Sequence, residues 1–485
     1  MNIGSDNFWA KLPAILQNIA QCDYAVIDLE MSGGVTSFHD DSITGIESKE
    51  DQAYTAARQG ATMHNILELG LTLLSFSKSS FKGSFTQARQ SPVNSLFLED
   101  TRTAYDFAAK QDRLVDFSYS ALKFLKAHGV DPITLSGIET YHNAGVPYLS
   151  REEHARAISR FHSARPFVPV EARELDDAAE TFQIETAESI QDWWSQRGDD
   201  TESLVICLPT ESVSRNALYQ RIVRQLIHDN YPLCETYSFN SSHGMRVQIK
   251  DEAADAERIN NKARKLEKAL KTQAGLRIVI EALCGGKFAG LVQPELVYGS
   301  NPSETPQQDA LERDLQSKLR NWEKKLQSSR PILVGHNLLY DLCFLYDAFI
   351  GALPNTWSQF SVQLFELFPR ILDTKVLALE ENPIEGGDPL EDLYKRWKGK
   401  EPAVDWQRVM YGYGHKAAAH SAGFDSYMTA MVFLALCHKR QGNMKQRLPE
   451  WEDGFWDVSR NTVRIGPGQI VQLGRPAIQP SEMEK

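Results

Sequence analysis

Apolar positions in the first eighty residues follow two different spacings. Over residues 7–21 they recur every three or four positions, which predicts an amphipathic helix. The run from Tyr24 to Met31 is almost continuously apolar and predicts a strand that ends at a glycine turn, and Ile66 to Phe76 predicts another strand. A helix is expected between them, around Asp51 to Arg58. Helices and strands in this order predict a layered α/β domain.

The middle of the chain is more polar. The acidic segment 171–202 lacks clear periodicity and is interpreted as a linker. Residues 203–250 predict a strand, a helix and a pair of strands, which would form a small inserted domain. The charged segment 251–271 predicts a solvated helix, and 300–330 a surface insertion with an exposed helix. The expected domains are therefore 1–170 (first part of the main domain), 171–202 (linker), 203–250 (inserted domain), 251–445 (second part of the main domain) and 446–485 (C-terminal extension).

Apolar runs return in the last third of the chain. Ile332 to Gly335 predicts a short strand that leads into a helix near Leu338. A long helix is expected over 421–439, followed by short strands within 451–473. Other expected elements are a strand near 104–107, a helix over 115–129, an apolar segment over 276–283 and a disordered tail beyond Pro476.

Composition narrows the class of protein. With 485 residues, 42% of them hydrophobic and 24% charged, the chain is long enough for a large core and ordinary for a globular protein. It lacks an apolar run of about 18 residues and a secretion signal, so we expect a protein without a membrane span that is not secreted, in the nucleus or the cytoplasm. The net charge of −12 argues against binding nucleic acid by bulk electrostatics. The six scattered cysteines suggest free thiols rather than disulfides or zinc ligands.

Two carboxylates interrupt the first apolar strand. Asp28 and Glu30 are two positions apart, so their side chains share one face of the strand while Ile27 and Leu29 share the other. Adjacent like charges repel, and divalent cations such as Mg²⁺ would stabilise them. The alternative is an edge strand whose polar face is in water.

Two further acids lie on apolar helix faces. Asp341 has leucine and phenylalanine three and four positions away, and Asp425 has methionine and valine at similar offsets. A buried carboxylate needs a partner because its desolvation is costly, and that partner could be a cation, a salt bridge or a helix cap. Together with the first pair, these acids favour a metal site. His420, five residues before Asp425, would suit a general base, although a surface role is the alternative.

Four carboxylates of this kind predict hydrolysis of a phosphodiester. Two divalent ions can activate a water and stabilise the attacking and leaving oxygens. The chain contains neither a Walker loop nor a dinucleotide-binding glycine fingerprint. Metal-dependent cleavage of nucleic acid is therefore the chemistry that the sequence favours.

The segments that carry these residues resemble the motifs of a known family. Asp-x-Glu at 28–30, Gly-His-Asn-x-x-x-Asp at 335–341 and His-x-x-x-x-Asp at 420–425 are similar to the three exonuclease motifs of the DEDD superfamily in its histidine-containing branch. More closely, the chain resembles the poly(A)-specific ribonuclease (PARN) family of 3′ to 5′ exoribonucleases. The similar stretches are 27–33, 145–149, 332–341, 368–375 and 420–427.

The resemblance implies the fold and the roles of the site residues. The expected fold is a ribonuclease H-like domain, with a mixed sheet flanked by helices, interrupted by a small α+β domain that binds single-stranded nucleic acid. The family also implies two Mg²⁺ ions, for which Mn²⁺ could substitute, and a homodimer. By analogy, the metal ligands would be Asp28, Glu30, Asp341 and Asp425, with His420 as the general base.

Five residues are candidates for RNA contact, namely Met31, Asn337, Lys375, Arg224 and His228. Arg224 and His228 are one turn apart on the expected helix of the inserted domain, a spacing also common on exposed helices. By resemblance, Asn337 and Lys375 would contact the 3′-terminal nucleotides. Asn337 could equally cap the next helix, and Lys375 could form a surface pair with Asp373.

The chain departs from the family at two points. Met31 stands where an aromatic residue is frequent, which puts the base preference in doubt. About sixty residues follow Asp425, too few for the C-terminal RNA-recognition domain of longer relatives. Together, the carboxylates and the family resemblance predict a Mg²⁺-dependent 3′ to 5′ exoribonuclease that degrades single-stranded RNA 3′ ends, poly(A) above all, and releases 5′-AMP. A trimmer of small-RNA 3′ ends and an inactive RNA-binding scaffold are the alternatives.

Overall fold

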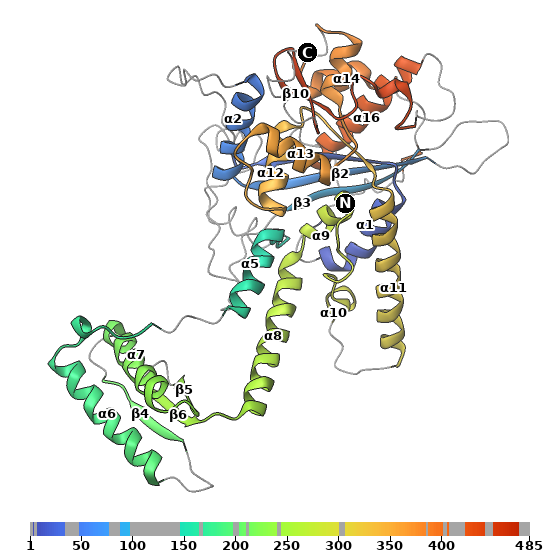
Figure 1. Cartoon of the computed structure of the whole chain (residues 1–485). Coiled ribbons are helices and arrows are strands. Elements are labelled where there is room, and N and C mark those ends of the chain that lie inside the picture. The colour runs from blue at the N-terminus through green and yellow to red at the C-terminus, as the bar shows by residue number, and fades with distance from the viewer. Residues whose placement is uncertain are drawn as a thin grey trace, which may run out of the picture. The chain divides into compact units, whose positions relative to one another are not determined.

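In the computed structural model the chain divides into two compact units (Figure 1). The larger unit comprises Met1–Ala157 and Lys268–Lys485, and the smaller unit comprises Ile158–Glu267. The expected strand near 104–107, the helix over 115–129, the tail beyond Pro476 and His420 lie outside the described residues. Described are residue 3 and residues 7–33, 48–76, 88–97, 146–163, 168–196, 203–209, 213–239, 244–299, 306–384, 387–400, 405–406, 422–441 and 450–474.

A six-stranded mixed sheet forms the centre of the larger unit, in the order β8-β7-β1-β2-β3-β9. Strands β8, β7 and β1 are parallel, whereas β2 is antiparallel to both of its neighbours, β1 and β3. This arrangement agrees with the expected mixed sheet. The strands are β1 (Tyr24–Met31), β2 (Ile66–Phe76), β3 (Ala88–Phe97), β7 (Ile332–Gly335), β8 (Ile371–Asp373) and β9 (Asp405–Trp406).

Helix α16 (Ala422–Gln441) lies against β1, β2 and β3. It is apolar on nearly every side and is buried along most of its length, as a helix inside a core should be. Tyr24 and Val26 of β1 join a core cluster with this helix, where the Tyr24 and Phe433 ring centroids are 5.1 Å apart. Ile27 and the other residues of alternate positions join the larger core cluster. The two sides of β1 therefore pack into different cores.

Most of the other helices of the larger unit contribute side chains to the larger core cluster. Helix α1 (Phe8–Gln21) has the expected apolar stripe, including Phe8 and Leu12, fully buried. The other helices of the larger unit are α2 (Lys49–Met63), α9 (Arg277–Cys284), α10 (Pro294–Tyr298), α11 (Pro306–Ser328), α12 (Leu339–Phe349), α13 (Trp357–Leu367), α14 (Thr374–Glu381) and α15 (Leu390–Trp397). Helices α5 (Arg151–His162) and α8 (Glu252–Ala274) each contain residues of both units.

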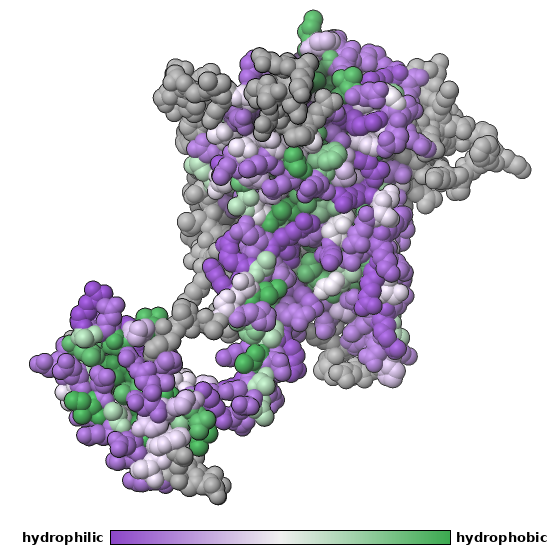
Figure 2. All heavy atoms as spheres, viewed as in Figure 1, coloured by the Kyte–Doolittle hydropathy of each residue, from purple (hydrophilic) through white to green (hydrophobic). Residues whose placement is uncertain are grey.

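Helix α11 differs from the exposed insertion expected over 300–330. Leu315, Leu319 and Leu326 are buried in the larger core, and the helix contacts α1. Only its outer face is hydrophilic, and Figure 2 shows that face as mainly purple. The abundant charges of this face concealed a leucine stripe at helical spacing. The helix is therefore part of the packed fold.

The smaller unit extends beyond the expected 203–250. A three-stranded sheet in the order β4-β6-β5 packs with helix α7, which matches the predicted strand–helix–strand–strand order. The linker expected over 171–202 is corrected, because most of it forms helix α6, whose Ile190 is fully buried in the same core. The acids of α6 face solvent and masked its apolar stripe. The elements are α6 (Asp177–Gln196), β4 (Leu204–Cys207), α7 (Val213–Asn230), β5 (Cys234–Phe239) and β6 (Gly244–Ile249), with a short 3-10 turn at Ala172–Glu174.

The C-terminal extension packs onto the larger unit. Trp456, in the 3-10 turn Gly454–Trp456, is fully buried and stacks on Phe433 of α16. Asn461 accepts a hydrogen bond from the Ile371 amide through Oδ1 and donates one to the Ile371 carbonyl, which ties the segment to β8. The hairpin of β10 (Thr462–Gly466) and β11 (Gln469–Gln472) follows.

Two expectations from composition can be compared with the structure. All six cysteines are free thiols, and four of them are buried. Within the described parts of the chain, no helix combines the length and apolar character needed to cross a membrane.

Candidate active site

Strand β1 presents Asp28 and Glu30 on the same face. Asp28 lies opposite Gly70 of β2, and Glu30 lies opposite Glu68. The register then shifts, because Met31 pairs with Ile66 and leaves an extra residue on β2. Such a bulge increases local twist and re-aims side chains at the end of a strand. The acid pair therefore lies where β1 departs from regular pairing.

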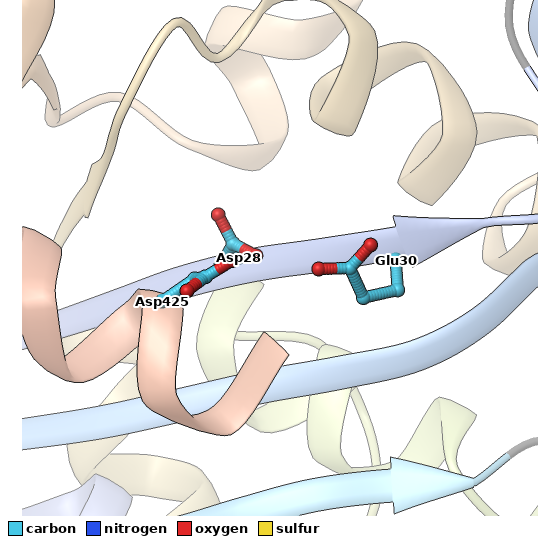
Figure 3. A group of neighbouring side chains, drawn as sticks. All are labelled: Asp28, Glu30 and Asp425. Atoms are coloured by element: carbon cyan, nitrogen blue, oxygen red, sulfur yellow. The ribbon is translucent and has the colours of Figure 1, made fainter. Parts of the chain in front are cut away.

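Helix α16 brings a third carboxylate to the pair. Asp425 is in its first turn and is 9% exposed. Oxygen atoms of Asp28, Glu30 and Asp425 all lie within 4.8 Å of one another (Figure 3). Residues four hundred positions apart in the sequence thus form a single acidic cluster with ligand atoms of the type that Mg²⁺ binds.

Asp341 approaches β1 from helix α12. Its Oδ1 accepts a hydrogen bond of 3.1 Å from the backbone amide of Leu29, the residue between the two β1 acids. The charge of Asp341 also contributes to raising the pKa of Asp28. All four predicted carboxylates therefore gather at one end of β1, three of them in the tight cluster and Asp341 anchored beside it.

Burial and mutual repulsion disfavour ionisation of these acids. Burial, followed by the charges of Asp425 and Glu68, raises the pKa of Glu30 to about 8. Burial raises the pKa of Asp341 to about 7, and burial together with Asp341 and Asp425 raises the pKa of Asp28 well above its usual range. Divalent cations would offset this repulsion and favour the ionised forms. The donor set therefore fits Mg²⁺ or Mn²⁺.

Asp373 organises the loops beside the acidic cluster. It is fully buried at the end of β8, and its Oδ1 accepts hydrogen bonds from the amides of Asn337 (2.8 Å) and Lys375 (2.9 Å). Its Oδ2 accepts from the amides of Leu338 (3.2 Å) and Arg464 (3.3 Å). One carboxylate thus joins the loop before α12, the start of α14 and the C-terminal hairpin. Sequence reasoning did not assign this role, although an acid between a buried strand and a helix is a recognisable N-cap signal.

Asn337 does not cap the helix that follows it. Helix α12 has no side-chain cap, and Asn337 lies in the left-handed region at φ 60°. Its Oδ1 accepts a hydrogen bond of 3.2 Å from Nη1 of Arg464. The capping alternative is therefore wrong, and Asn337 presents an exposed side chain at the entrance to α12.

Lys375 is not part of a surface pair. It is 4% exposed, and its Nζ donates to the carbonyl oxygens of Gly387 (2.9 Å) and Asp388. These bonds use two of the three N–H donors of the ammonium group.

The other candidates for RNA contact lie in different settings. Met31 is half-buried and packs against the larger core. In the smaller unit, Arg224 is exposed on α7 and donates to Oε1 of Gln220 (3.1 Å). His228, one turn later, is exposed with its Nδ1 2.8 Å from Oδ1 of Asp229. The structure leaves Arg224 and His228 accessible to a ligand.

The mixed sheet and the carboxylate cluster at the end of its first strand define a metal-dependent nuclease of the ribonuclease H-like type. The model of the CAF1 family ribonucleases matches residues 3–433. The chain therefore belongs to the CAF1 ribonuclease family, within the DEDD superfamily. This confirms the predicted fold class and the predicted exoribonuclease class.

Several relatives are similar to parts or most of the chain. The pre-piRNA 3′-exonuclease trimmer of Bombyx mori is 30% identical over 126 residues, which are 24% of each chain. The 3′-5′ exoribonuclease parn-1 of Caenorhabditis elegans is 31% identical over 30% of this chain and 28% of its own length. The poly(A)-specific ribonuclease PARN of Xenopus laevis is 22% identical over 90% of this chain and 62% of its own. The solved structure of Schizosaccharomyces pombe Pop2p with Mg²⁺ and Mn²⁺ bound covers 92% of this chain and 96% of its own, at 11% identity and a TM-score of 0.37.

Proposed function

We propose that the protein is a Mg²⁺-dependent 3′ to 5′ exoribonuclease that removes nucleotides from single-stranded RNA 3′ ends, with poly(A) as the preferred substrate and 5′-AMP as the product. The observation that carries the proposal is the convergence of Asp28, Glu30 and Asp425 oxygens within 4.8 Å, with Asp341 bonded to the strand between them.

The four carboxylates would hold two divalent ions. When bound, these ions would activate water and stabilise charge on the attacking and leaving oxygens of the phosphodiester. Asp28 and Glu30 supply oxygens from a rigid strand, and Asp425 closes the cluster from α16. Burial of the cluster strengthens these electrostatic interactions because little water screens them. Replacement of Mg²⁺ by Mn²⁺ should preserve activity, and chelation by EDTA should abolish it.

We assign the general base to His420. It lies five residues before Asp425 in the sequence. A neutral imidazole could accept the proton of the attacking water. His420→Ala should lower kcat while leaving binding of Mg²⁺ intact.

Recognition of the RNA is assigned to residues in both units. Asn337 and Lys375 would contact the 3′-terminal nucleotides, and Met31 would pack on a base or sugar. Arg224 and His228 of the smaller unit would also contact the RNA. Each single substitution should raise KM more than it lowers kcat.

The substrate preference is the most informative property to test. Rates should be compared on 5′-labelled oligo(A), oligo(U), oligo(C) and oligo(dA) of equal length. A preference for oligo(A) supports the deadenylase proposal. Equal rates on the three RNAs would leave an exonuclease without poly(A) preference, as a trimmer of small-RNA 3′ ends requires, and no cleavage of any substrate would favour the inactive scaffold.

We also propose a homodimer, on the resemblance alone. Light scattering of the purified protein tests it directly. A mass of one chain over the working concentration range would contradict the proposal.

A further inference from the structure

The C-terminal hairpin brings a cationic side chain to the loop before α12. The backbone amide of Arg464 donates to Oδ2 of Asp373 (3.3 Å), which fixes the main chain of β10 at this position. Its guanidinium Nη1 donates to Oδ1 of Asn337 (3.2 Å). Because Asp373 also binds the amides of Asn337 and Leu338, Arg464 is held at the entrance to the helix that carries Asp341.

The guanidinium is under-used in this position. Among the described residues, no carboxylate forms an ion pair with Arg464, and its buried Nε has no hydrogen-bond partner. An arginine that served only to hold the loop would be expected to use its fork of donors on a carboxylate or on carbonyl oxygens. Arg460, four residues earlier, donates to the carbonyl oxygens of Trp451 and Asp453 and lies 3.7 Å from Oδ1 of Asp457, although its Nε likewise has no hydrogen-bond partner among the described residues.

A second cation, Lys375, is held at the same carboxylate, because its backbone amide also donates to Asp373. Burial, and then the charge of Arg464, lowers the pKa of Lys375. Burial, followed by the charges of Lys375 and Arg464, lowers the pKa of His336 to about 3, so this imidazole is neutral at neutral pH. The cations therefore repel each other, and a bound anion would stabilise both.

Topology places these cations near the acidic cluster. Strands β1, β7 and β8 are parallel and adjacent, so their carboxyl ends meet at one edge of the sheet. Asp28 and Glu30 are near the end of β1, while Asn337 and Lys375 lie two residues beyond the ends of β7 and β8. An RNA strand whose scissile phosphate lies at the acids would pass along this edge, with a neighbouring phosphate beside the cations.

We propose that Arg464 is a phosphate-binding residue of the active site, whose guanidinium binds a backbone phosphate of the RNA next to the scissile one. This inference rests on the proposed function. A guanidinium can bind a phosphate with two parallel N–H groups, and the two Nη atoms provide such a pair, because each carries two N–H groups and Nη1 uses one of them on Asn337. Phosphate binding by Arg464 would also make the hairpin β10–β11 part of the substrate site rather than a peripheral extension.

The test compares three variants of the full chain on oligo(A) with saturating Mg²⁺. Arg464→Gln should raise KM about tenfold or more, the loss expected for a charge-assisted hydrogen bond, with kcat within about twofold. Arg464→Lys should retain part of the affinity, because it keeps the charge but loses the fork. Arg320→Gln, on the exposed face of α11, removes an equal charge and should behave as wild type.

Two measurements distinguish phosphate binding by Arg464 from support of the loop. They are the salt dependence of KM and the response to an RNA with one uncharged linkage. Loss of one phosphate contact to single-stranded RNA should reduce the slope of log KM against log salt by about 0.7. One methylphosphonate linkage beside the scissile phosphate should weaken wild type but leave Arg464→Gln unchanged. If Arg464→Gln raises KM without changing the salt slope or the response to this linkage, Arg464 only supports the loop and the inference is wrong.

The outcome also separates this inference from the proposed function. If wild type degrades RNA and Arg464→Gln matches Arg320→Gln, the inference fails while the exonuclease stands. If wild type degrades no RNA, both fail. Circular dichroism melting checks that Arg464→Gln folds, and Arg464→Lys carries the comparison if it does not.

Discussion

The backbone of Gly70 lies directly against that of Ala422. A Cβ on Gly70 would overlap the carbonyl oxygen of Ala422 and lie 2.7 Å from the amide nitrogen of Gly423. Gly70 is the cross-strand partner of Asp28, and Ala422 begins the helix that carries Asp425. A glycine at this position therefore lets α16 approach the sheet closely enough for Asp425 to join the acidic cluster.

Replacing Gly70 should disrupt this approach. In Gly70→Ala the added methyl must displace the start of α16, because backbone atoms of the helix cannot rotate away. We expect activity below about 1% of wild type and a loss of about 1–3 kcal/mol in unfolding free energy, typical of overpacking. Activity assays and urea denaturation measure the two effects.

Gly290→Ala is the matched control. No atom lies within 4 Å of the position of its added Cβ, so its activity and stability should stay close to wild type. Full activity of Gly70→Ala would show that the approach of α16 does not position the site.

The metal-free protein should become less stable as pH rises. Folding raises the pKa of Glu30 to about 8 and that of Asp341 to about 7, mainly through burial. Between about pH 4.5 and 8 the folded state therefore keeps protons that the unfolded state has lost, so the free energy of unfolding falls with increasing pH. The expected loss is a few kcal/mol, measured by urea denaturation in EDTA at pH 5.5 and 8.

Glu30→Gln should flatten this dependence and stabilise the metal-free protein at pH 8, although it should be inactive. Glu312→Gln, in helix α11, is the control and should leave the slope as in wild type. A metal-free wild-type protein that is more stable at pH 8 than at pH 5.5 would contradict the repulsion described for the cluster.

Mg²⁺ should stabilise the protein more at pH 8 than at pH 6. Mg²⁺ binding requires the ionised carboxylates, so Glu30 and Asp341 release protons when the ion binds. The apparent affinity for Mg²⁺ therefore decreases as the pH is lowered. Thermal melts with and without roughly 10 mM Mg²⁺ measure the change in melting temperature. At Mg²⁺ concentrations well above Kd, the expected stabilisation is about 1–3 kcal/mol. In Asp425→Asn the shift should be small, and an undiminished shift would mean that Asp425 is not a ligand.

Asp373→Ala should destabilise the larger unit by about 3–5 kcal/mol. The substitution leaves four backbone N–H groups without their acceptor in a buried position. Asp314→Ala, from an exposed pair with Lys318, should cost less than about 1 kcal/mol. Equal small losses for both variants, measured by urea denaturation, would show that Asp373 does not hold these loops.

Local patterns were sufficient for the main elements of the fold. The apolar run of β1, interrupted by Asp28 and Glu30, predicted both the strand and the face on which the acids lie. The apolar residues around Asp425 similarly indicated a buried helix. In each case the signal is contained in a few neighbouring residues.

Features that depend on distant contacts could not be predicted in this way. The acids of α6 outnumber its buried residues and obscure its apolar stripe in the sequence, so only its packing in the smaller unit distinguishes it from a linker. Nothing in the sequence around Arg464 indicates a ligand, because its position beside Asn337 depends on how the C-terminal hairpin packs. The role of Gly70 likewise depends on a helix that begins 352 residues later, at Ala422.

The central claim is that the carboxylates at the end of β1 perform metal-dependent hydrolysis of RNA from its 3′ end. The direct test is the Mg²⁺-dependent decay of a 5′-labelled oligo(A) by wild type and by Asp28→Asn, which keeps the size of the side chain but removes its charge. Wild type should shorten the RNA one nucleotide at a time, and the variant should be slower by about a thousandfold or more. Decay by Asp28→Asn at the wild-type rate would contradict the assignment of the site.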